Sequence, residues 1–468
     1  MEKIKFGTDG WRAIIAKDFT VDNVARVTQA TGEWLKKNFD QPSVVVGHDC
    51  RFAGELFAET VTRVLLSQGI KVFLARDFVS TPMVSLGALK HKASLGIIIT
   101  ASHNPPSYNG YKLKGHYGGP LLPEKIQEIE DMIPDLCSIE FSKIDLSAEE
   151  KNNHLIYSDL ETMYLHHVEE NFDLEAIKNS GLRLAYDCMY GAGQRIMKRL
   201  FPNIVHLHAD YNPGFHGQAP EPIHKNLLEF SDLIKKRGDI DCGLCTDGDA
   251  DRIGLYDSKG NFVDSHHIIL LLVKYLVEHK KYSGKVITAV SVTPRIKKLC
   301  KHFGLENVTT KIGFKYIAGY MISDDVLLGG EESGGISIKG HIPERDGIWM
   351  GLTLWEYMAK TGKKLEELIK DLYDITGAFF YERNDLHLDE KLKLNIVKNC
   401  TENKYTSFGS YHVEATDKTD GWKYFLKEEQ WMMIRASGTE PVLRLYAEGS
   451  NEAAAKKILE ETKKSILS

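Results

Sequence analysis

Three aspartates on alternate residues follow an apolar, strand-like segment: Asp247, Asp249 and Asp251. Carboxylates this close repel one another, so we expect a cation to bind between them. Because all three ligands offer oxygen, Mg²⁺ or Ca²⁺ is favoured over zinc. An EF-hand loop, which also begins Asp-x-Asp-x-Asp, requires Gly at its sixth position and Glu at its twelfth. Arg252 and Ser258 stand there, so the EF-hand interpretation fails, and a solvated acidic turn is the other alternative.

A serine hydroxyl follows a second apolar segment, in the sequence Thr-Ala-Ser-His-Asn-Pro that contains Ser102. In isolation, a serine at such a place is usually a turn or cap residue. Octahedral Mg²⁺ bound by three carboxylates still lacks ligands, and a phosphate oxygen is a usual complement. A phosphorylated Ser102 would supply that oxygen, which links the two segments by their chemistry.

Two later segments contain groups that recognise sugars and phosphates. Gly-Glu-Glu-Ser-Gly-Gly at residues 330–335 offers Glu331 and Ser333, and a carboxylate can accept two hydroxyl hydrogen bonds at once. A plain polar loop is the alternative there. Arg-Ala-Ser-Gly-Thr-Glu-Pro at residues 435–441 gathers a guanidinium, hydroxyls and flexible backbone, which together suit a phosphate: Arg435, Ser437, Gly438 and Thr439.

Buried strands must position these loops, because each of the first three loops follows a continuous apolar run. Such runs occupy residues 95–99, 242–246 and 326–330, and further strands are expected at 43–47, 182–186 and 285–290. Helical periodicity at residues 23–39 and 55–68 alternates with the strands, which predicts α/β units. Strands at 431–435 and 442–446, followed by a helix at 451–466, predict a different last domain.

We therefore predict an α/β protein with three similar mixed α/β domains and a smaller C-terminal α+β domain. Ligands of open α/β sheets bind beyond the strand ends, where the polar loops lie. The expected domains are residues 1–147 with the serine loop, 148–254 with the aspartates, 255–374 with the sugar loop and 375–468 with the phosphate loop.

Composition narrows the function classes. The 468 residues have a formal charge of −6, which argues against nucleic acid as a partner but allows a small phosphorylated substrate. We expect no membrane association, because there is no secretion signal and no apolar stretch of about 20 residues. The seven scattered cysteines favour reduced thiols in the cytoplasm, and Cys242 and Cys245 are interpreted as buried structural residues.

Five segments in the same order resemble motifs of the α-D-phosphohexomutase superfamily. They are the four loops above and the opening Phe-Gly-Thr-Asp-Gly-Trp-Arg at residues 6–12, so the resemblance covers nearly the whole chain. It implies four domains around a central cleft, a phosphoryl group carried by Ser102, and one Mg²⁺ per chain held by the aspartates and the phosphorylated serine. A hexose 1,6-bisphosphate would be the intermediate and activator.

The resemblance also assigns roles to single residues. Catalytic roles are expected for Ser102, Arg12, Lys112, His103 and His341. Substrate contacts are expected for Glu331, Ser333, Lys315, Arg252, Arg345, Arg435, Ser437, Gly438 and Thr439. An Asn-Gly pair at residues 109–110 predicts a hairpin that returns Lys112 to Ser102, with its pKa lowered by Mg²⁺ and arginines so that it serves as a general base. His341 is the second candidate base, because Gly335 stands where some family members carry a histidine.

The expected reaction interconverts hexose 1-phosphate and hexose 6-phosphate. Residues 313–317, Gly-Phe-Lys-Tyr-Ile, resemble the specificity segment of phosphoglucomutase-like members, so glucose comes first. A phosphomannomutase or dual enzyme comes second and a phosphopentomutase third, while a glucosamine substrate is disfavoured. A phosphoserine-dependent phosphatase and a non-catalytic sugar-phosphate binder are the rivals from other classes. The chain is expected to be a monomer or a homodimer.

Overall fold

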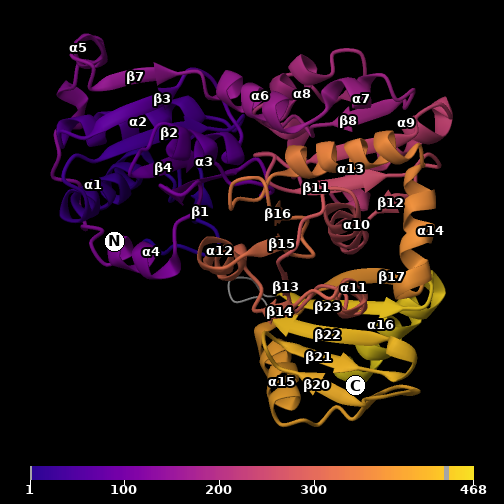
Figure 1. Ribbon diagram of the computed structural model, residues 1–468. Coiled ribbons are helices and arrows are strands. Elements are labelled where there is room, and N and C mark those ends of the chain that lie inside the picture. The colour runs from indigo at the N-terminus through magenta and orange to yellow at the C-terminus, as the bar shows by residue number, and fades with distance from the viewer. Residues whose placement is uncertain (1–2, 437–441) are drawn as a thin grey trace. The chain divides into compact units, whose positions relative to one another are not determined.

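The computed structural model describes residues 3–436 and 442–468 (Figure 1). The chain divides into two compact units, which we treat separately. The first contains the residues up to Val286 together with Gly313–Ile369, and the second contains Ile287–Ile312 and Lys370–Ser468.

The first unit begins with a 7-stranded mixed sheet in the order β1-β5-β4-β2-β3-β7, with β6 paired to β5. Its elements are β1 (Trp11–Ile14), α1 (Val21–Asn38), β2 (Ser43–His48), α2 (Gly54–Ser67), β3 (Lys71–Ala75), α3 (Thr81–Lys90), β4 (Leu95–Ile99), β5 (Tyr108–Gly115), β6 (Gly119–Pro120), α4 (Pro123–Glu130), α5 (Leu146–Lys151) and β7 (Leu155–Ser158). Strands β3, β2 and β4 run parallel, whereas β5 is antiparallel to both β4 and β1.

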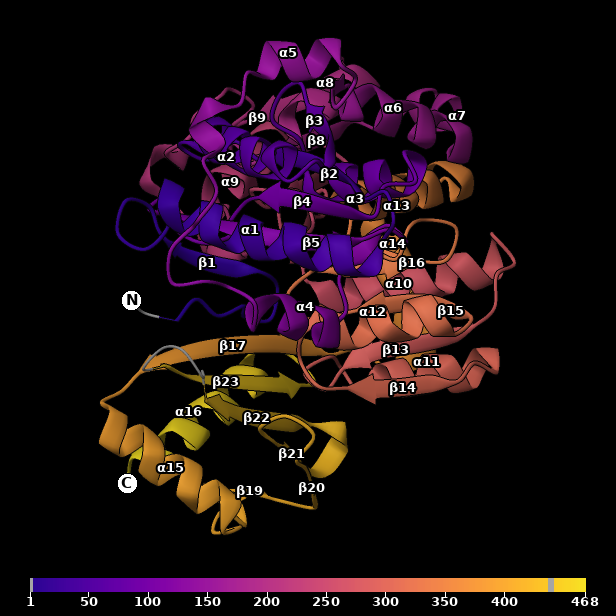
Figure 2. The same cartoon turned by 90° about the vertical axis from the view of Figure 1, so that its left-hand side faces the viewer.

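Alternation along β2 explains why helices cover both faces of this sheet (Figure 2). Val44 and Val46 belong to a core that also includes residues of α1 and α2. On the opposite face, a Cβ at Gly47 would meet Val84 of α3 at 2.8 Å, so α3 lies directly against the strand. Since successive side chains of a strand point to opposite faces, the run of valines is buried on both sides.

A second sheet of the first unit has five strands in the order β12-β11-β10-β8-β9. Its segment contains α6 (Leu160–Asn171), α7 (Leu174–Lys178), β8 (Leu184–Asp187), α8 (Gln194–Leu200), β9 (Val205–Leu207), α9 (Leu228–Arg237), β10 (Cys242–Thr246), β11 (Ile253–Tyr256) and β12 (Phe262–Val263). The aspartate loop connects β10 to β11, which pair antiparallel. Cys242 and Cys245 are buried free thiols, as predicted.

The rest of the first unit contains an antiparallel pair of strands that flanks the sugar loop. Its elements are α10 (Ser265–Glu278), α12 (Phe314–Ser323), β15 (Val326–Gly330), β16 (Ile336–Ile338) and α13 (Gly347–Thr361), while β13 (Lys285–Ala289) and α14 (Leu365–Thr376) extend across the boundary between the units. The described part of the chain has no helix long and apolar enough to span a bilayer.

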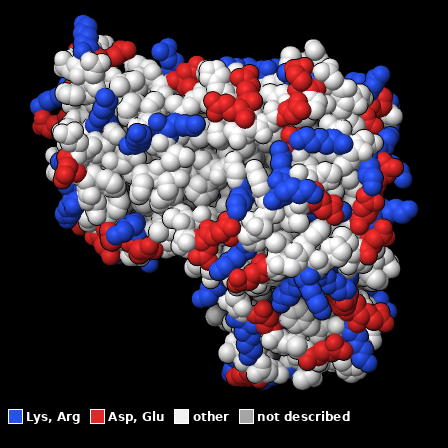
Figure 3. Space-filling model, in the orientation of Figure 1, with Lys and Arg blue, Asp and Glu red and all other residues white. Residues whose placement is uncertain are grey.

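The second unit contains a five-stranded antiparallel sheet in the order β17-β23-β22-β21-β20. Its elements are α11 (Arg295–Phe303), β14 (Asn307–Thr310), β17 (Phe380–His387), α15 (Glu390–Thr401), β18 (Ser407–Phe408), β19 (Tyr411–His412), β20 (Ala415–Asp417), β21 (Trp422–Phe425), β22 (Trp431–Ala436), β23 (Val442–Gly449) and α16 (Glu452–Leu467). Helix α16 packs on β23 and β17. On the face shown in Figure 3, cationic and anionic side chains are interspersed.

The predicted α/β class and the strands that precede the functional loops are confirmed. The hairpin turn predicted at Asn109 and Gly110 is wrong, because both residues lie inside β5. A Cβ at Gly110 would meet the carbonyl oxygens of Thr100 at 2.4 Å and Trp11 at 2.8 Å, so glycine is needed there for close backbone approach. The chain turns earlier, at residues 100–107, within the serine loop itself.

Candidate active site

Ser102 lies in the loop that connects the antiparallel strands β4 and β5, and it is buried. Its backbone φ of 53° falls in the left-handed region, which is uncommon for a residue with a side chain. The Ser102 N–H donates to Thr100 Oγ1 at 2.9 Å. Ser102 Oγ donates to Asp247 Oδ2 at 2.7 Å and lies 3.3 Å from His103 Nδ1. The loop therefore directs the hydroxyl at the aspartate segment.

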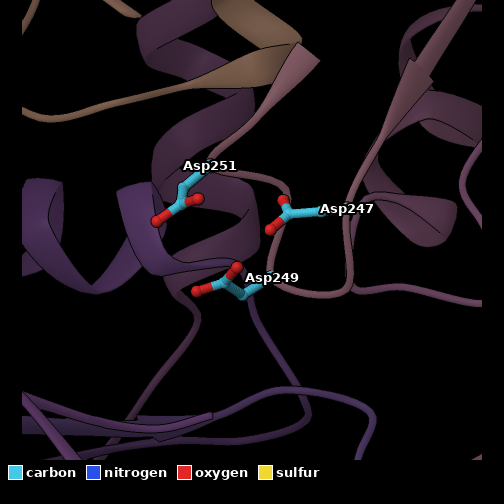
Figure 4. Close-up of side chains that lie close together, drawn as sticks. All are labelled: Asp247, Asp249 and Asp251. Carbon is cyan, nitrogen blue, oxygen red and sulfur yellow. The ribbon is translucent and has the colours of Figure 1, made fainter. Parts of the chain in front are cut away.

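The carboxylates of the three buried aspartates face a common space, and one oxygen from each lies within 4.8 Å of the others (Figure 4): Asp247, Asp249 and Asp251. Among the described residues, Asp249 Oδ1 and Asp251 Oδ1 have no hydrogen-bond partner. Burial and the two neighbouring carboxylates raise the pKa of Asp247 well above its ordinary value. Buried oxygens without partners and mutual repulsion fit a hard divalent cation, and the donor set is consistent with Mg²⁺.

Lys112 extends from β5 to the same aspartates. Its Nζ lies 2.7 Å from Asp249 Oδ2, 3.1 Å from Asp251 Oδ2 and 2.8 Å from Asp9 Oδ2. Burial by itself would lower the pKa of Lys112, but the three carboxylates raise it above its ordinary value. The anionic partners thus outweigh the nearby arginines in the absence of a cation, and the lowered pKa expected with Mg²⁺ bound stays a prediction.

Two arginines lie on either side of Asp9. Arg12 Nη1 donates to Asn104 Oδ1 of the serine loop at 2.7 Å, and its Nη2 is 3.7 Å from Asp9 Oδ2. Arg345 Nη2 contacts Asp9 and lies 2.6 Å from Asp251 Oδ2. Burial would raise the pKa of Asp9, but Arg345, followed by Lys112, Lys114 and Arg12, holds it well below the ordinary range. The predicted residues Arg12 and Arg345 are thus brought together, through an aspartate that sequence analysis did not select.

The sugar loop lies next to the start of α12. Glu331 is buried, and its Oε1 accepts the N–H of Gly313 at 2.7 Å. Burial raises the pKa of Glu331 to about 7. Lys315 is half-buried in the first turn of α12, with its Nζ 5.5 Å from the centroid of the Tyr316 ring. Glu331 therefore fixes the segment that presents Lys315, while Ser333 is half-buried in the same loop as Glu331.

Two further predicted residues border the aspartate segment. The N–H of Arg252 donates to Asp247 Oδ1 at 3.1 Å, and its guanidinium lies 3.9 Å from Glu221 Oε1. Burial, followed by the cations around it, lowers the pKa of His103 well below its ordinary value. The ring of His103 is therefore neutral near pH 7 and presents one acceptor nitrogen.

His341 lies in the segment between β16 and α13. Its side chain is buried, its ring stacks on Trp349 with centroids 3.8 Å apart, and Nε2 lies 3.0 Å from Asp346 Oδ2. Its Nδ1 is 3.3 Å from His167 Nε2, so both ring nitrogens have partners. At Gly335, a Cβ would lie 2.5 Å from Cδ of Arg345, so neither position offers a free imidazole to the site.

The predicted phosphate loop begins in the second unit. Arg435 lies near the end of β22, and its Nε is 3.3 Å from Asp420 Oδ1. Ser437, Gly438 and Thr439 lie outside the described residues.

Thr81 is a functional residue that sequence reasoning missed. It begins α3, its Oγ1 donates to Asp249 Oδ2 at 2.5 Å, and its N–H donates to the Asp249 carbonyl oxygen at 3.0 Å. The threonine orients one ligand of the aspartate triad. A Ser-Thr-Pro sequence marks a helix start, which was the one signal available.

The chain was compared with known protein families. Four descriptions match in order along the chain: phosphoglucomutase/phosphomannomutase α/β/α domain I at residues 3–137, domain II at 162–260, domain III at 264–375, and the C-terminal domain at 399–465. The chain belongs to the α-D-phosphohexomutase superfamily. It is accordingly an enzyme of the mutase class, an isomerase that transfers a phosphoryl group.

Individual phosphohexomutases resemble the chain over its whole length. A phosphoglucomutase/phosphomannomutase of Thermococcus kodakarensis is 29% identical over 97% of this chain and 96% of its own. A phosphoglucosamine mutase of Methanocaldococcus jannaschii is 30% identical over 97% and 96%. A crystal structure described as a putative phosphomannomutase from Thermus thermophilus shares 31% identity and a TM-score of 0.88, with 100% of both chains covered.

Proposed function

We propose that the protein interconverts hexose 1-phosphate and hexose 6-phosphate through a phosphorylated Ser102. The hydrogen bond from Ser102 Oγ to Asp247, 2.7 Å long, is the observation that supports this assignment best. It brings a hydroxyl that can carry phosphate next to a triad that can bind a cation. Mg²⁺ bound there would supply positive charge beside the transferring phosphoryl group.

The chain's own residues account for the remaining requirements of the step. The bond between phosphorus and Ser102 Oγ breaks as a bond forms between phosphorus and a substrate hydroxyl oxygen. Lys112, which is protonated, donates its proton to the departing Ser102 Oγ and takes up the proton of the substrate hydroxyl, so the serine ends as a neutral hydroxyl and the lysine ends as it began. Arg12 and Arg345 neutralise the oxygens of the phosphoryl group, because this chemistry depends on positioning and charge.

The product of this first step is a hexose 1,6-bisphosphate. It turns over so that its other phosphate faces Ser102, which then takes that phosphate back. Glu331 and Ser333 would accept the hexose hydroxyls in both orientations. Arg435, with Ser437, Gly438 and Thr439, would hold the phosphate that is not being transferred. The same bisphosphate, supplied in trace amounts, would charge Ser102 and act as the activator.

Glucose is the first candidate hexose, because residues 313–317 resemble the phosphoglucomutase-like segment and present Lys315. Glucosamine is the second candidate, since several relatives are named phosphoglucosamine mutases. The sequence alone had disfavoured this substrate. Mannose follows from the two-sugar name of another relative. We expect the enzyme to act in the cytoplasm, where its seven cysteines stay reduced.

A parallel assay of four sugar 1-phosphates tests the proposal: glucose, mannose, glucosamine and ribose. Each reaction contains Mg²⁺ and a trace of the matching bisphosphate, and both the 6-phosphate (5-phosphate for ribose) and inorganic phosphate are measured. We expect isomerisation with preference for one hexose and no net release of phosphate. Release of phosphate would support a phosphatase, and no turnover of any sugar would support a non-catalytic binder.

The Ser102→Ala variant identifies the phosphoryl carrier in the same assay. We expect its turnover to fall by roughly 1,000-fold or more, because a group that forms the covalent intermediate has no substitute. Its thermal unfolding should match that of the unchanged protein. Near-normal turnover in this variant would refute the phosphoserine assignment.

A further inference from the structure

The serine loop is held from within by an arginine that the proposed reaction does not use. Arg51 lies between β2 and α2, and its side chain is completely buried. Four loop carbonyls accept its guanidinium hydrogens: those of Pro105 and Tyr108 from Nη1, at 2.9 and 3.1 Å, and those of Ser102 and Asn104 from Nη2, at 2.7 and 2.6 Å.

The carbonyls of Ser102, Asn104 and Pro105 lie in the turn at residues 100–107, outside the β-ladders, and that of Tyr108 lies at the first residue of β5. The Pro105 carbonyl also accepts the N–H of Tyr108 at 3.0 Å. A buried carbonyl without a donor destabilises a loop, so the guanidinium replaces a β-ladder for this segment. Its planar fork can serve four acceptors at once, whereas a lysine ammonium has three donors on a flexible stem. The contact with the carbonyl of Ser102 itself ties the reacting residue to the arginine.

Further contacts fix the guanidinium. Its Nε lies 3.5 Å from Asp49 Oδ2, and its carbon lies 5.0 Å from the centroid of the Phe215 ring. The backbone N–H of Arg51 donates to Asp49 Oδ1 at 2.9 Å. Asp49 Oδ2 also accepts the Thr100 hydroxyl at 2.5 Å. Thr100 in turn accepts the N–H of Ser102, so both backbone polar groups of Ser102 are connected to the segment of Asp49 and Arg51.

We propose that Arg51 is the positioning residue of the phosphoserine loop, which sets the place of Ser102 Oγ for phosphoryl transfer without contacting the substrate. This inference rests on the proposed role of Ser102. It predicts different effects on kcat and on KM, because a displaced loop slows the transfer while the groups that bind the sugar and its second phosphate stay in place. The rate constant kcat should therefore change far more than KM.

The first test compares Arg51→Lys with a matched control, Arg26→Lys. Arg26 is also buried, and its Nε donates to the carbonyl of Pro134 at 2.7 Å. We expect R51K to lower kcat roughly 100-fold with KM changed less than about threefold, since displacements near 1 Å have effects of this size. R26K should keep kcat within about twofold. The fraction of each protein that glucose 1,6-bisphosphate can phosphorylate is measured by intact mass, and turnover is divided by that fraction.

A second variant distinguishes a displaced loop from loss of the fold. Arg51 also lines a hollow of about 730 Å³, so truncating its side chain to alanine should open its position to that hollow. Millimolar guanidinium ion should raise the kcat of Arg51→Ala at least several-fold. The same addition should leave the kcat of R26K unchanged. Thermal unfolding is followed for every protein and condition.

Several outcomes would overturn the inference. They are a kcat of R51K within about threefold of the unchanged protein, an equal change in kcat and KM, or recovery of thermal stability without kcat when guanidinium is added. Unfolding of both Arg51 variants would also overturn it, because it would assign the arginine to domain stability. Absence of turnover in the unchanged protein and in R26K would instead refute the proposed function.

Discussion

Compensating charges surround the aspartate triad at the level of single side chains. Lys112 contacts two of the aspartates, and Arg345 contacts Asp251. Asp9 contacts both cations and so reduces the repulsion between them. Because Asp9, Asp249 and Asp251 each have a cationic neighbour, removal of that cation leaves an uncompensated charge in a dry environment. Asp9 therefore belongs to the same charge cluster as the three aspartates.

Glu331 predicts a measurable dependence of stability on pH. Its pKa is about 7 in the folded protein, above the ordinary value of 4.5, because it is buried. Near pH 6 the folded state therefore holds a proton that the unfolded state has lost, and stability falls as the pH rises from about 5 to 8. We expect Glu331→Gln to remove a loss of up to about 3 kcal/mol over this interval.

Urea unfolding of both proteins at pH 5, 6, 7 and 8 checks the Glu331 prediction. Only the difference between the two curves matters, because other groups titrate equally in both. Glu332→Gln serves as the control, since Glu332 is its half-buried neighbour. Parallel curves for Glu331→Gln and the unchanged protein would contradict the assignment of the raised pKa.

Residue types and local spacing predicted Ser102 and the triad, because their ligand atoms come from short continuous segments. Thr81 and Asp249 are 168 residues apart, so their hydrogen bond could not be inferred without the fold. The ion pairs that raise the pKa of Lys112 could not be inferred for the same reason. The sequence indicated its neighbours by motif, but it did not indicate that three carboxylates would lie within contact distance.

Strand ends position the chemistry at the level of elements. The serine loop follows β4, the aspartate loop follows β10 and the sugar loop follows β15, as apolar runs predicted. The predicted hairpin turn at residues 109–110 was misplaced because an Asn-Gly pair was interpreted as a turn. In the fold, Gly110 is needed where β1 and the end of β4 approach β5.

The first residue of α3 yields a prediction about metal affinity. Thr81→Val keeps the shape of the side chain but removes the hydroxyl that donates to Asp249 Oδ2. Groups that orient a metal ligand typically change affinity by about 10- to 100-fold, and we expect a loss in this range. Isothermal titration with Mg²⁺ or Mn²⁺ measures it, with Thr81→Ser as the control that keeps the hydroxyl. Equal affinities for all three proteins would show that Asp249 needs no such support.

A buried ion pair connects distant parts of the first unit at the scale of the whole molecule. Lys114 Nζ, on β5, lies 2.7 Å from Glu344 Oε2, in the segment before α13, and neither side chain is exposed. Ser85 of α3 donates to the same carboxylate at 2.8 Å. Glu344 directly precedes Arg345, so the pair also fixes the segment that presents this arginine.

Breaking the pair should destabilise the protein more than removing it. Lys114→Met leaves the buried Glu344 with only a longer contact to a cation, 3.9 Å from Oε1 to Arg345 Nε, and we expect a loss of about 3 kcal/mol. The double variant with Glu344→Leu should recover a large part of that loss, because no unpaired charge is left. Chemical unfolding of the single and double variants measures the difference. A double variant less stable than Lys114→Met would rule out this explanation.

Motif order along the chain predicted the superfamily and the α/β class, because these depend on sequence alone. The domain boundaries at residues 147, 254 and 374 stay predictions, as does the grip on the second phosphate. The preferred hexose depends on contacts between single side chains and the sugar, and motif matching does not resolve these.

The backbone of Ser102 has a consequence for selection experiments. Its φ of 53° suits glycine better than any other residue, at a difference of about 1 kcal/mol or more. A library screened only for heat resistance should therefore enrich glycine at this position and lose the hydroxyl. A library screened for growth that requires the proposed mutase activity should keep serine. The two screens would therefore select different residues at position 102.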